Sequence, residues 1–211
     1  MASNCMQEIF FGIAILIMSV VVHEVSHGYV ADILGDPTAR FSGRLTLNPI
    51  SHLDPFGSVI LPLLTFFTTG FIFGWAKPVP YNPYNLQKGK YGPGIVALAG
   101  PMANFVIAIF FALFVRFGVG SFSPFVIELA AYVVLINLLL GFFNLIPIPP
   151  LDGSKVVASF LPYNLYQKWS RIEAVTTQYS LIFLFLFVFL FFGIFSSFIQ
   201  LMFSLLVGFS F

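Results

Sequence analysis

Charge is scarce in this 211-residue chain: only 8% of its residues are Asp, Glu, Lys or Arg, against roughly 25% in an average soluble domain. Hydrophobic residues make up 59%, with 29 Phe among them, and the mean hydropathy is +0.98. This composition predicts an integral membrane protein in contact with the lipid bilayer. A net charge of +1 and the lack of any basic run argue against a nucleic-acid partner.

Cysteine is nearly absent too. Cys5 is the single one, so the chain can form neither an internal disulfide nor a Cys-rich metal site. Residues 1–8 carry no Lys or Arg, and the apolar run that follows them leads directly into a polar motif. We therefore expect no cleavable signal peptide, and we expect the first apolar segment to stay in the mature protein.

Long apolar runs, in contrast, are abundant. They predict an all-α polytopic membrane protein, a transmembrane helix bundle that forms a single domain over residues 1–211. A helix needs about 20 apolar residues to cross the hydrocarbon layer. The expected spans are 7–34, 94–116, 125–147 and 179–195, and the C-terminal run allows a further helix over 197–210.

The run 56–75 is uncharged as well, but Pro62 and the Thr68-Thr69-Gly70 sequence interrupt it. Segments with alternating or proline-rich patterns lie on either side, at 41–47 and 75–80. We expect these segments to be extended and to form a small re-entrant β element after the first span.

The strongest polar signal is His23-Glu24-Val25-Ser26-His27, an HExxH motif in the first span. Residues i and i+4 of a helix lie one turn apart on one face, so His23 and His27 can offer two imidazole nitrogens to one Zn²⁺. Glu24 has the position of the general base in metalloproteases with this motif. With three His and four Glu in the chain, about one shuffled sequence in two thousand would contain the motif. A site with a function is therefore favoured over buried polar residues that only pair with one another.

Further motifs follow in the later apolar runs. Gly100-Pro101 with Asn104 lies in the span 94–116, and Asn144-Leu145-Ile146-Pro147 with Leu151-Asp152-Gly153 follows the span 125–147. Together with HExxH, and in this order, they resemble the site-2 protease family of intramembrane zinc metalloproteases. The resemblance is greatest to small prokaryotic members without a PDZ or CBS domain, and it covers most of the chain up to about Gly153.

The resemblance implies an enzyme, a zinc metalloendopeptidase that hydrolyses peptide bonds in or near transmembrane segments of membrane-protein substrates during regulated intramembrane proteolysis. It implies one Zn²⁺ per chain, held by His23, His27 and Asp152, with Glu24 as the catalytic base. Three protein ligands and one open position are the usual arrangement of a catalytic zinc site. By the same analogy, Asn144 is a catalytic residue that orients the substrate or stabilises the oxyanion.

Two other polar residues have simpler interpretations. Asn104 matches the family motif, but a polar residue in a span more often forms a hydrogen bond to a neighbouring helix, and we favour that role over catalysis. His52 could be an additional ligand or a substrate contact. In a proline-rich turn, a histidine more often binds the local backbone, and we favour that. Asp36 and Asp54, each followed by Pro, are expected to form turns.

The proposed third ligand constrains the topology. For Asp152 to reach the HExxH motif, the C-terminal ends of the spans 7–34 and 125–147 must face the same side of the membrane. A full crossing by 56–75 would place them on opposite sides, so we predict that this run is re-entrant or interfacial.

The distribution of Lys and Arg agrees with this topology. Without a crossing by 56–75, eight of the nine basic residues lie on one side and Arg116 lies on the other; with a crossing, the split is six to three. By the positive-inside rule, the chain is a multi-pass cell-membrane protein with an exterior N-terminus and a site that opens toward the cytoplasm. The eight residues are Arg40, Arg44, Lys77, Lys88, Lys90, Lys155, Lys168 and Arg171.

Two alternatives remain open. In an unrelated membrane zinc peptidase, the third ligand would be a glutamate, and Glu128 or Glu173 would have to serve, although both are most simply solvated interfacial residues. A non-proteolytic membrane transporter or scaffold with a relict metal site would retain the motif without cleaving any substrate.

Overall fold

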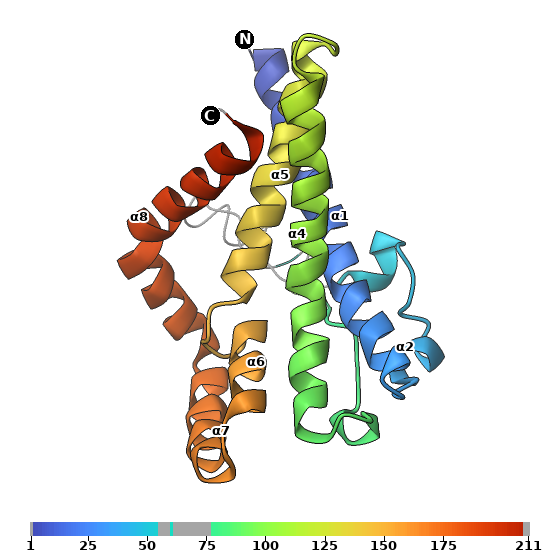
Figure 1. Cartoon of the computed structure of the whole chain (residues 1–211), viewed down its shortest axis with the longest axis vertical. Coiled ribbons are helices and arrows are strands. Elements are labelled where there is room, and N and C mark those ends of the chain that lie inside the picture. Colours follow the sequence, from blue (N-terminus) through green and yellow to red (C-terminus); the bar gives the residue numbers. More distant parts are fainter. Residues whose placement is uncertain (1, 55–59, 61–76, 209–211) are drawn as a thin grey trace.

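The computed structural model describes residues 2–54, 60 and 77–208, and the regular elements in these ranges are helices (Figure 1). Within these described ranges, four helices are long and apolar enough to cross a membrane, which confirms the prediction of an all-α polytopic membrane protein. They are α1 (Ala2–Ile33), α4 (Gly92–Gly118), α5 (Pro124–Asn144) and α8 (Ser180–Val207). Helix α8 is continuous through Gly193, so one helix occupies the region in which the sequence allowed two.

Helices α1, α4 and α5 lie side by side, and α8 leans against α4 and α5 (Figure 1). Helices α1 and α5 run from the end of the bundle where the N-terminus lies to the opposite end, and α4 and α8 run back. Small residues such as Ala108 and Ala112 of α4 face Ala130 and Ala131 of α5 in the main core cluster. Small side chains let helix backbones approach closely where lipid supplies no hydrophobic driving force.

Helix α1 ends at a glycine. Gly35 has a φ of 101°, and the Asp36 N–H donates to the Ala31 carbonyl at 2.9 Å, which is the bond pattern of a Schellman cap. Asp36 is fully buried just beyond this cap and accepts hydrogen bonds from Thr38, the Asn82 backbone and the Asn85 amide.

These bonds affect the titration of Asp36. Burial alone would raise the pKa of Asp36, but the bonds from Thr38, Asn82 and Asn85 outweigh burial and hold that pKa below its ordinary value. The carboxylate thus does more than form the turn expected from the sequence. It joins the end of α1 to a loop almost fifty residues later, which the local pattern around Asp36 did not indicate.

The chain leaves α1 and enters α4 at the same end of the bundle (Figure 1). The Gln87 N–H donates to the Leu34 carbonyl at 2.8 Å, and Ala31 packs in one cluster with Leu86 and Val96. The run 56–75 was expected to be re-entrant; apart from residue 60, it lies outside the described residues. The short elements of this region are α2 (Thr38–Phe41), η1 (Pro49–His52), η3 (Pro83–Asn85) and η4 (Gly89–Tyr91).

The expected β element is not supported. None of the described residues forms a strand: Phe41 belongs to α2, and residues 44–48 and 77–82 have no regular secondary structure. A strand requires a ladder of backbone bonds to a partner. Instead, the Phe41 N–H bonds to the Pro37 carbonyl within a helical turn, and the turn that follows places Gly43 at a φ of 64°. Trp75 and Ala76 lie outside the described residues.

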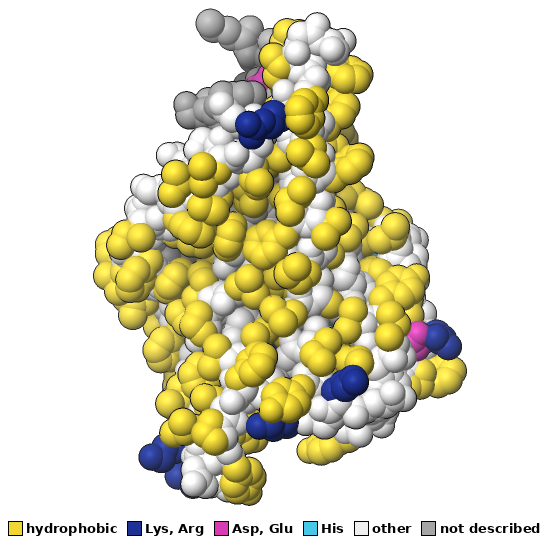
Figure 2. Space-filling model, in the orientation of Figure 1, with side chains coloured by type: hydrophobic (Ala, Val, Ile, Leu, Met, Phe, Trp, Pro, Cys, Tyr) yellow, Lys and Arg dark blue, Asp and Glu magenta, His cyan; other side chains and the backbone are white. Residues whose placement is uncertain are grey.

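Two further helices follow α5 at the end of the bundle where α1 ends, namely α6 (Asp152–Phe160) and α7 (Tyr163–Gln178) (Figure 1). Figure 2 shows a broad apolar surface over the spans, while most of the visible Lys and Arg side chains gather toward the end formed by α6 and α7. Arg116 lies in the last turn of α4, which is the end of that helix away from α6 and α7.

Candidate metal centre

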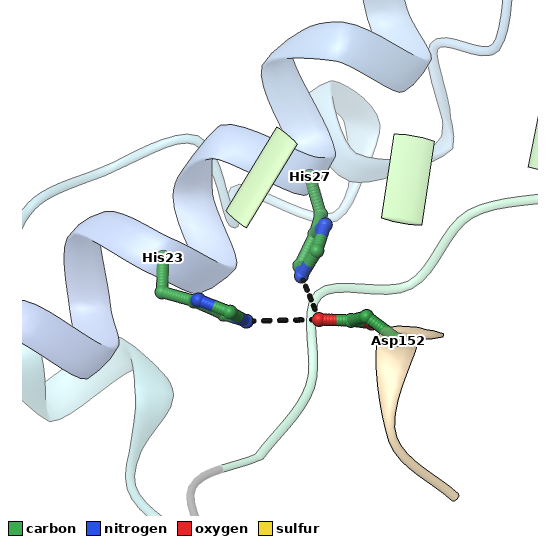
Figure 3. A group of neighbouring side chains, drawn as sticks. All are labelled: His23, His27 and Asp152. Carbon is green, nitrogen blue, oxygen red and sulfur yellow. Dashed lines mark hydrogen bonds and ion pairs between the residues drawn. The ribbon is translucent and has the colours of Figure 1, made fainter. Parts of the chain in front are cut away.

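Two imidazoles and one carboxylate converge inside the bundle (Figure 3). The Nε2 atoms of His23 and His27 lie 3.0 and 3.2 Å from Oδ2 of Asp152. All three side chains are buried, and their candidate ligand atoms lie within 4.8 Å of one another. Among the described residues, this is the one group of three or more His, Cys, Asp or Glu that could hold a metal ion. The fold thus brings Asp152 to the HExxH motif from 129 residues away.

Asp152 reaches this position because the chain unwinds after α5. The segment from Leu145 to Leu151 contains three prolines, which cannot donate backbone bonds to a continuing helix. Gly153 then lies so close to the end of α5 that a Cβ there would be 2.2 Å from the Leu145 carbonyl oxygen. Glycine is therefore required after Asp152, and Asp152 is the first residue of α6.

The imidazole nitrogens that face away from Asp152 are also bound. Nδ1 of His27 lies 2.7 Å from the Val96 carbonyl oxygen, and Nδ1 of His23 lies 2.6 Å from Oδ1 of Asn104. A carbonyl oxygen only accepts hydrogen bonds, so Nδ1 of His27 carries a proton, and Nε2, which faces Asp152, is the nitrogen available to a metal. Helix α4 thus supplies an outer partner for each histidine.

Gly100 of α4 keeps space open at the same place. A Cβ at this position would lie 2.5 Å from Nε2 of His27 and 2.6 Å from Nε2 of His23. Only glycine leaves these two nitrogens unobstructed, and neutral imidazole nitrogens with a carboxylate are a donor set that zinc prefers. The residues present therefore fit a bound zinc ion.

This contact predicts the effect of Gly100→Ala. The added methyl group would displace imidazoles that are held from behind by Asn104 and Val96, and we expect zinc affinity to fall at least about tenfold. Competition with a coloured zinc chelator measures the affinity. Gly12→Ala is the matched control, because a Cβ at Gly12 of α1 meets no atom within 4 Å. Equal zinc affinity of the two variants would contradict the prediction.

Glu24 lies beside this group and is half-buried. Its Oε2 accepts a hydrogen bond from the Val79 backbone N–H at 3.1 Å. Gly28, one turn further along α1, makes this possible, because a Cβ there would lie 2.7 Å from the Val79 side chain. The extended segment that contains Val79 therefore lies against the face of α1 that carries the carboxylate.

The other candidate residues have different partners. The Asn144 amide donates to the Leu140 carbonyl of its own helix at 3.0 Å, so its catalytic role stays a prediction. Asn104 is fully buried and bonds helix to helix, as expected, and one of its partners on α1 is His23. His52 is buried in η1, and its Nε2 lies 2.9 Å from the Thr46 carbonyl oxygen, which agrees with the backbone role favoured for it.

The two glutamates considered as alternative ligands lie elsewhere. Glu128 is exposed near the start of α5. It precedes Asn144, at the other end of that helix, by 16 residues, which is about 24 Å along the axis. Glu173 belongs to α7. Neither is in the group that could hold a metal, whereas Asp152 is.

Sequence reasoning missed three contributors to the site. Gly100 was noticed within a motif, but no role followed from it. The carbonyl of Val96 and the N–H of Val79 are backbone groups, and no sequence signal could have identified them. A helical HExxH motif with a distant Asp, held within a membrane helix bundle, is an arrangement typical of a metallopeptidase centre.

Comparison with known proteins gives the family. Residues 121–188 match Peptidase family M50. A Bacillus subtilis protein named "Putative zinc metalloprotease YwhC" is 37% identical over 75% of this chain and 73% of its own length. Proteins named "Putative zinc metalloprotease Rip2" from Mycolicibacterium smegmatis and Mycobacterium tuberculosis are 30% identical over 68% and 80% of this chain. The chain belongs to peptidase family M50, which confirms the resemblance to site-2 proteases.

The matches differ in extent. The chain spans 56% and 62% of the two mycobacterial proteins, so it covers less than two thirds of their length. No solved structure matches the chain.

Proposed function

We propose that this protein is an intramembrane zinc metalloendopeptidase that hydrolyses peptide bonds in or near transmembrane segments of membrane-protein substrates. The observation that carries the proposal is the convergence of His23, His27 and Asp152 inside a membrane helix bundle, with Glu24 on the same helix. One Zn²⁺ per chain is the cofactor, and these three side chains are its ligands. Bound there, it would supply a Lewis acid for the scissile carbonyl and activate water as a nucleophile.

Glu24 has the task of the general base. Its carboxylate accepts a proton from the attacking water and later donates it to the leaving amine. The hydrogen bond from the Val79 N–H to Oε2 orients this carboxylate. We assign to Oε1 the role of taking the proton from the attacking water. Asn144 retains a second amide N–H besides the one that bonds Leu140, and we assign this N–H to a substrate carbonyl oxygen.

The substrate must unwind before it can react. In a helix, each peptide carbonyl is bonded within the helix and enclosed by side chains, so attack requires local unwinding. The segment after α5 is itself unwound at Pro147 and Pro149, and we propose that it borders the polar cavity in which this happens. Regulated intramembrane proteolysis of this kind would release the cleaved segment from the membrane.

For the orientation, we propose an exterior N-terminus and a site that opens toward the cytoplasm. Arg40 of α2, Lys155 of α6 and Arg171 of α7 belong to elements at the end of the bundle where α1 and α5 end. Arg116 lies at the other end of α4. Under the positive-inside rule, this distribution places the end with α6 and α7 in the cytoplasm.

Reconstitution tests the proposed function. The purified full chain is placed in liposomes with a mixture of single-span membrane proteins, and fragments are mapped by mass spectrometry. We expect new termini within or next to the spans, their loss after zinc is removed with a chelator, and their return after Zn²⁺ is added. A zinc-loaded protein that cuts soluble peptides but no span would contradict intramembrane proteolysis. A purified protein that binds no zinc would favour the transporter or scaffold alternative.

A further inference from the structure

A second layer of polar side chains lies behind His23. Ser19 of α1, Asn104 of α4 and Asn137 of α5 are 5%, 0% and 0% exposed, respectively, in the middle of three spans. Burial of uncharged polar groups in such surroundings is costly unless each of them is hydrogen-bonded. We therefore expect each of these three residues to have hydrogen-bond partners.

The layer is connected by four bonds besides the one to His23. The Asn104 amide Nδ2 donates to Oδ1 of Asn137 at 2.8 Å and to the Ser19 carbonyl at 3.3 Å. The Asn137 amide Nδ2 donates to Oγ of Ser19 and to the Val133 carbonyl, each at 2.9 Å. Ser19, Asn104 and Asn137 thus form one network that links α1, α4 and α5 at the level of a candidate zinc ligand.

The two backbone carbonyls fix the direction of every amide in this network. The oxygens of Ser19 and Val133 can only accept, so each must face an Nδ2 rather than an Oδ1. With its Nδ2 turned to Val133 and to Ser19 Oγ, Asn137 presents Oδ1 to Asn104. Asn104 must then present its own Oδ1 to His23.

This direction determines the tautomer of His23. An amide oxygen only accepts, so Nδ1 of His23 carries a proton, and Nε2, which faces the Asp152 carboxylate, is the nitrogen that can give up its proton to bind zinc. If the Asn104 amide were reversed, its N–H₂ group would face Nδ1, and the proton would move to Nε2. The histidine could then no longer bind zinc through Nε2.

We propose that Asn137 and Ser19 are positioning residues, which hold Asn104 in the orientation that keeps His23 in the zinc-binding tautomer. Within the described part of the chain, neither side chain is hydrogen-bonded to the side chain of His23, His27 or Asp152, and both act through Asn104. The inference rests on the proposed function in one respect, namely that zinc binds to His23, His27 and Asp152. A role limited to helix packing would leave the tautomer of His23 and the zinc affinity unchanged.

Asn137→Leu tests the proposal, because leucine has a similar volume and offers Asn104 no acceptor. We expect zinc affinity, measured by chelator competition, to fall roughly 10- to 100-fold. In the zinc-loaded protein labelled with ¹⁵N-histidine, we expect the His23 resonances of the form with a proton on Nδ1 and zinc at Nε2 to weaken. Ser19→Ala, which removes the hydroxyl that accepts from Asn137, is expected to change both measurements in the same direction.

The control is Thr176→Val. Thr176 is also buried, and its hydroxyl bonds to its own helix at the Ile172 carbonyl, so this variant loses a comparable bond away from the site. It should keep the zinc affinity of the unchanged protein. If Asn137→Leu does not fold, Ser19→Ala carries the test alone. Unchanged zinc affinity and unchanged His23 resonances in the folded variants would overturn the proposal, whereas an unchanged protein that binds no zinc would overturn the proposed function.

Discussion

Glu24→Gln is expected to reduce the rate of substrate cleavage by roughly 10²- to 10⁴-fold, because the amide cannot take a proton from the attacking water. Zinc content should stay at one ion per chain, since Glu24 is not a member of the ligand group. Glutamine is also nearly isosteric with glutamate, and its amide oxygen can still accept the Val79 N–H. The loss should therefore appear in kcat and not in folding or in metal binding.

Cleavage of a validated single-span substrate in liposomes measures this effect, with zinc content determined on the same samples. Glu128→Gln is the matched control, because Glu128 is exposed near the start of α5 and should keep full activity. Full cleavage by Glu24→Gln would show that Glu24 is not the general base. Loss of zinc from Glu24→Gln would also count against this assignment, because Glu24 would then be needed to hold the metal.

The environment of Glu24 shows why the surrounding fold matters to this result. Gly28 permits the segment that contains Val79 to approach α1, and the Val79 N–H then holds the carboxylate. The buried Asp36 anchors the same segment a few residues later through the Asn82 backbone. The position of the base thus depends on a loop fastened to the end of α1, as well as on the helix that carries the residue.

How much of the fold and of the site could be predicted depends on how far apart in the sequence the interacting residues lie. The HExxH pair was predictable, because helical periodicity alone brings His23 and His27 to one face. Nothing local connects these residues with Asp152, and only the family resemblance suggested the connection. The prediction that the ends of two spans share one side followed from it, and α1 and α5 do end at the same end of the bundle.

The prediction of a β element was wrong. A strand is stabilised by its partner rather than by its own pattern, and residues 41–47 instead enter a helical turn and an irregular segment. The outer partner of His27 was missed because Val96 contributes only a backbone carbonyl. Asn137 was also missed, although a polar residue within an apolar run is a signal that favours function in a membrane span.

Asp152→Asn is expected to have the largest effect on metal binding. The neutral amide is a much weaker zinc ligand than a carboxylate, and we expect affinity to fall by more than the roughly 100-fold upper range for outer-shell changes. Cleavage should be lost with the metal. Zinc per chain after gel filtration, together with chelator competition, measures the effect, and Glu128→Gln again serves as the control.

The same comparison tests the position of the chain after α5. If Asp152→Asn kept one zinc per chain and Glu128→Gln lost it, the third ligand would lie at the other end of α5, about 24 Å away. The HExxH motif and Asp152 would then not share a site, and the requirement that 56–75 not cross the membrane would disappear. Loss of zinc from Asp152→Asn alone would instead support the shared site, because a metal bound by α1 and by the segment after α5 requires both helices to end on one side.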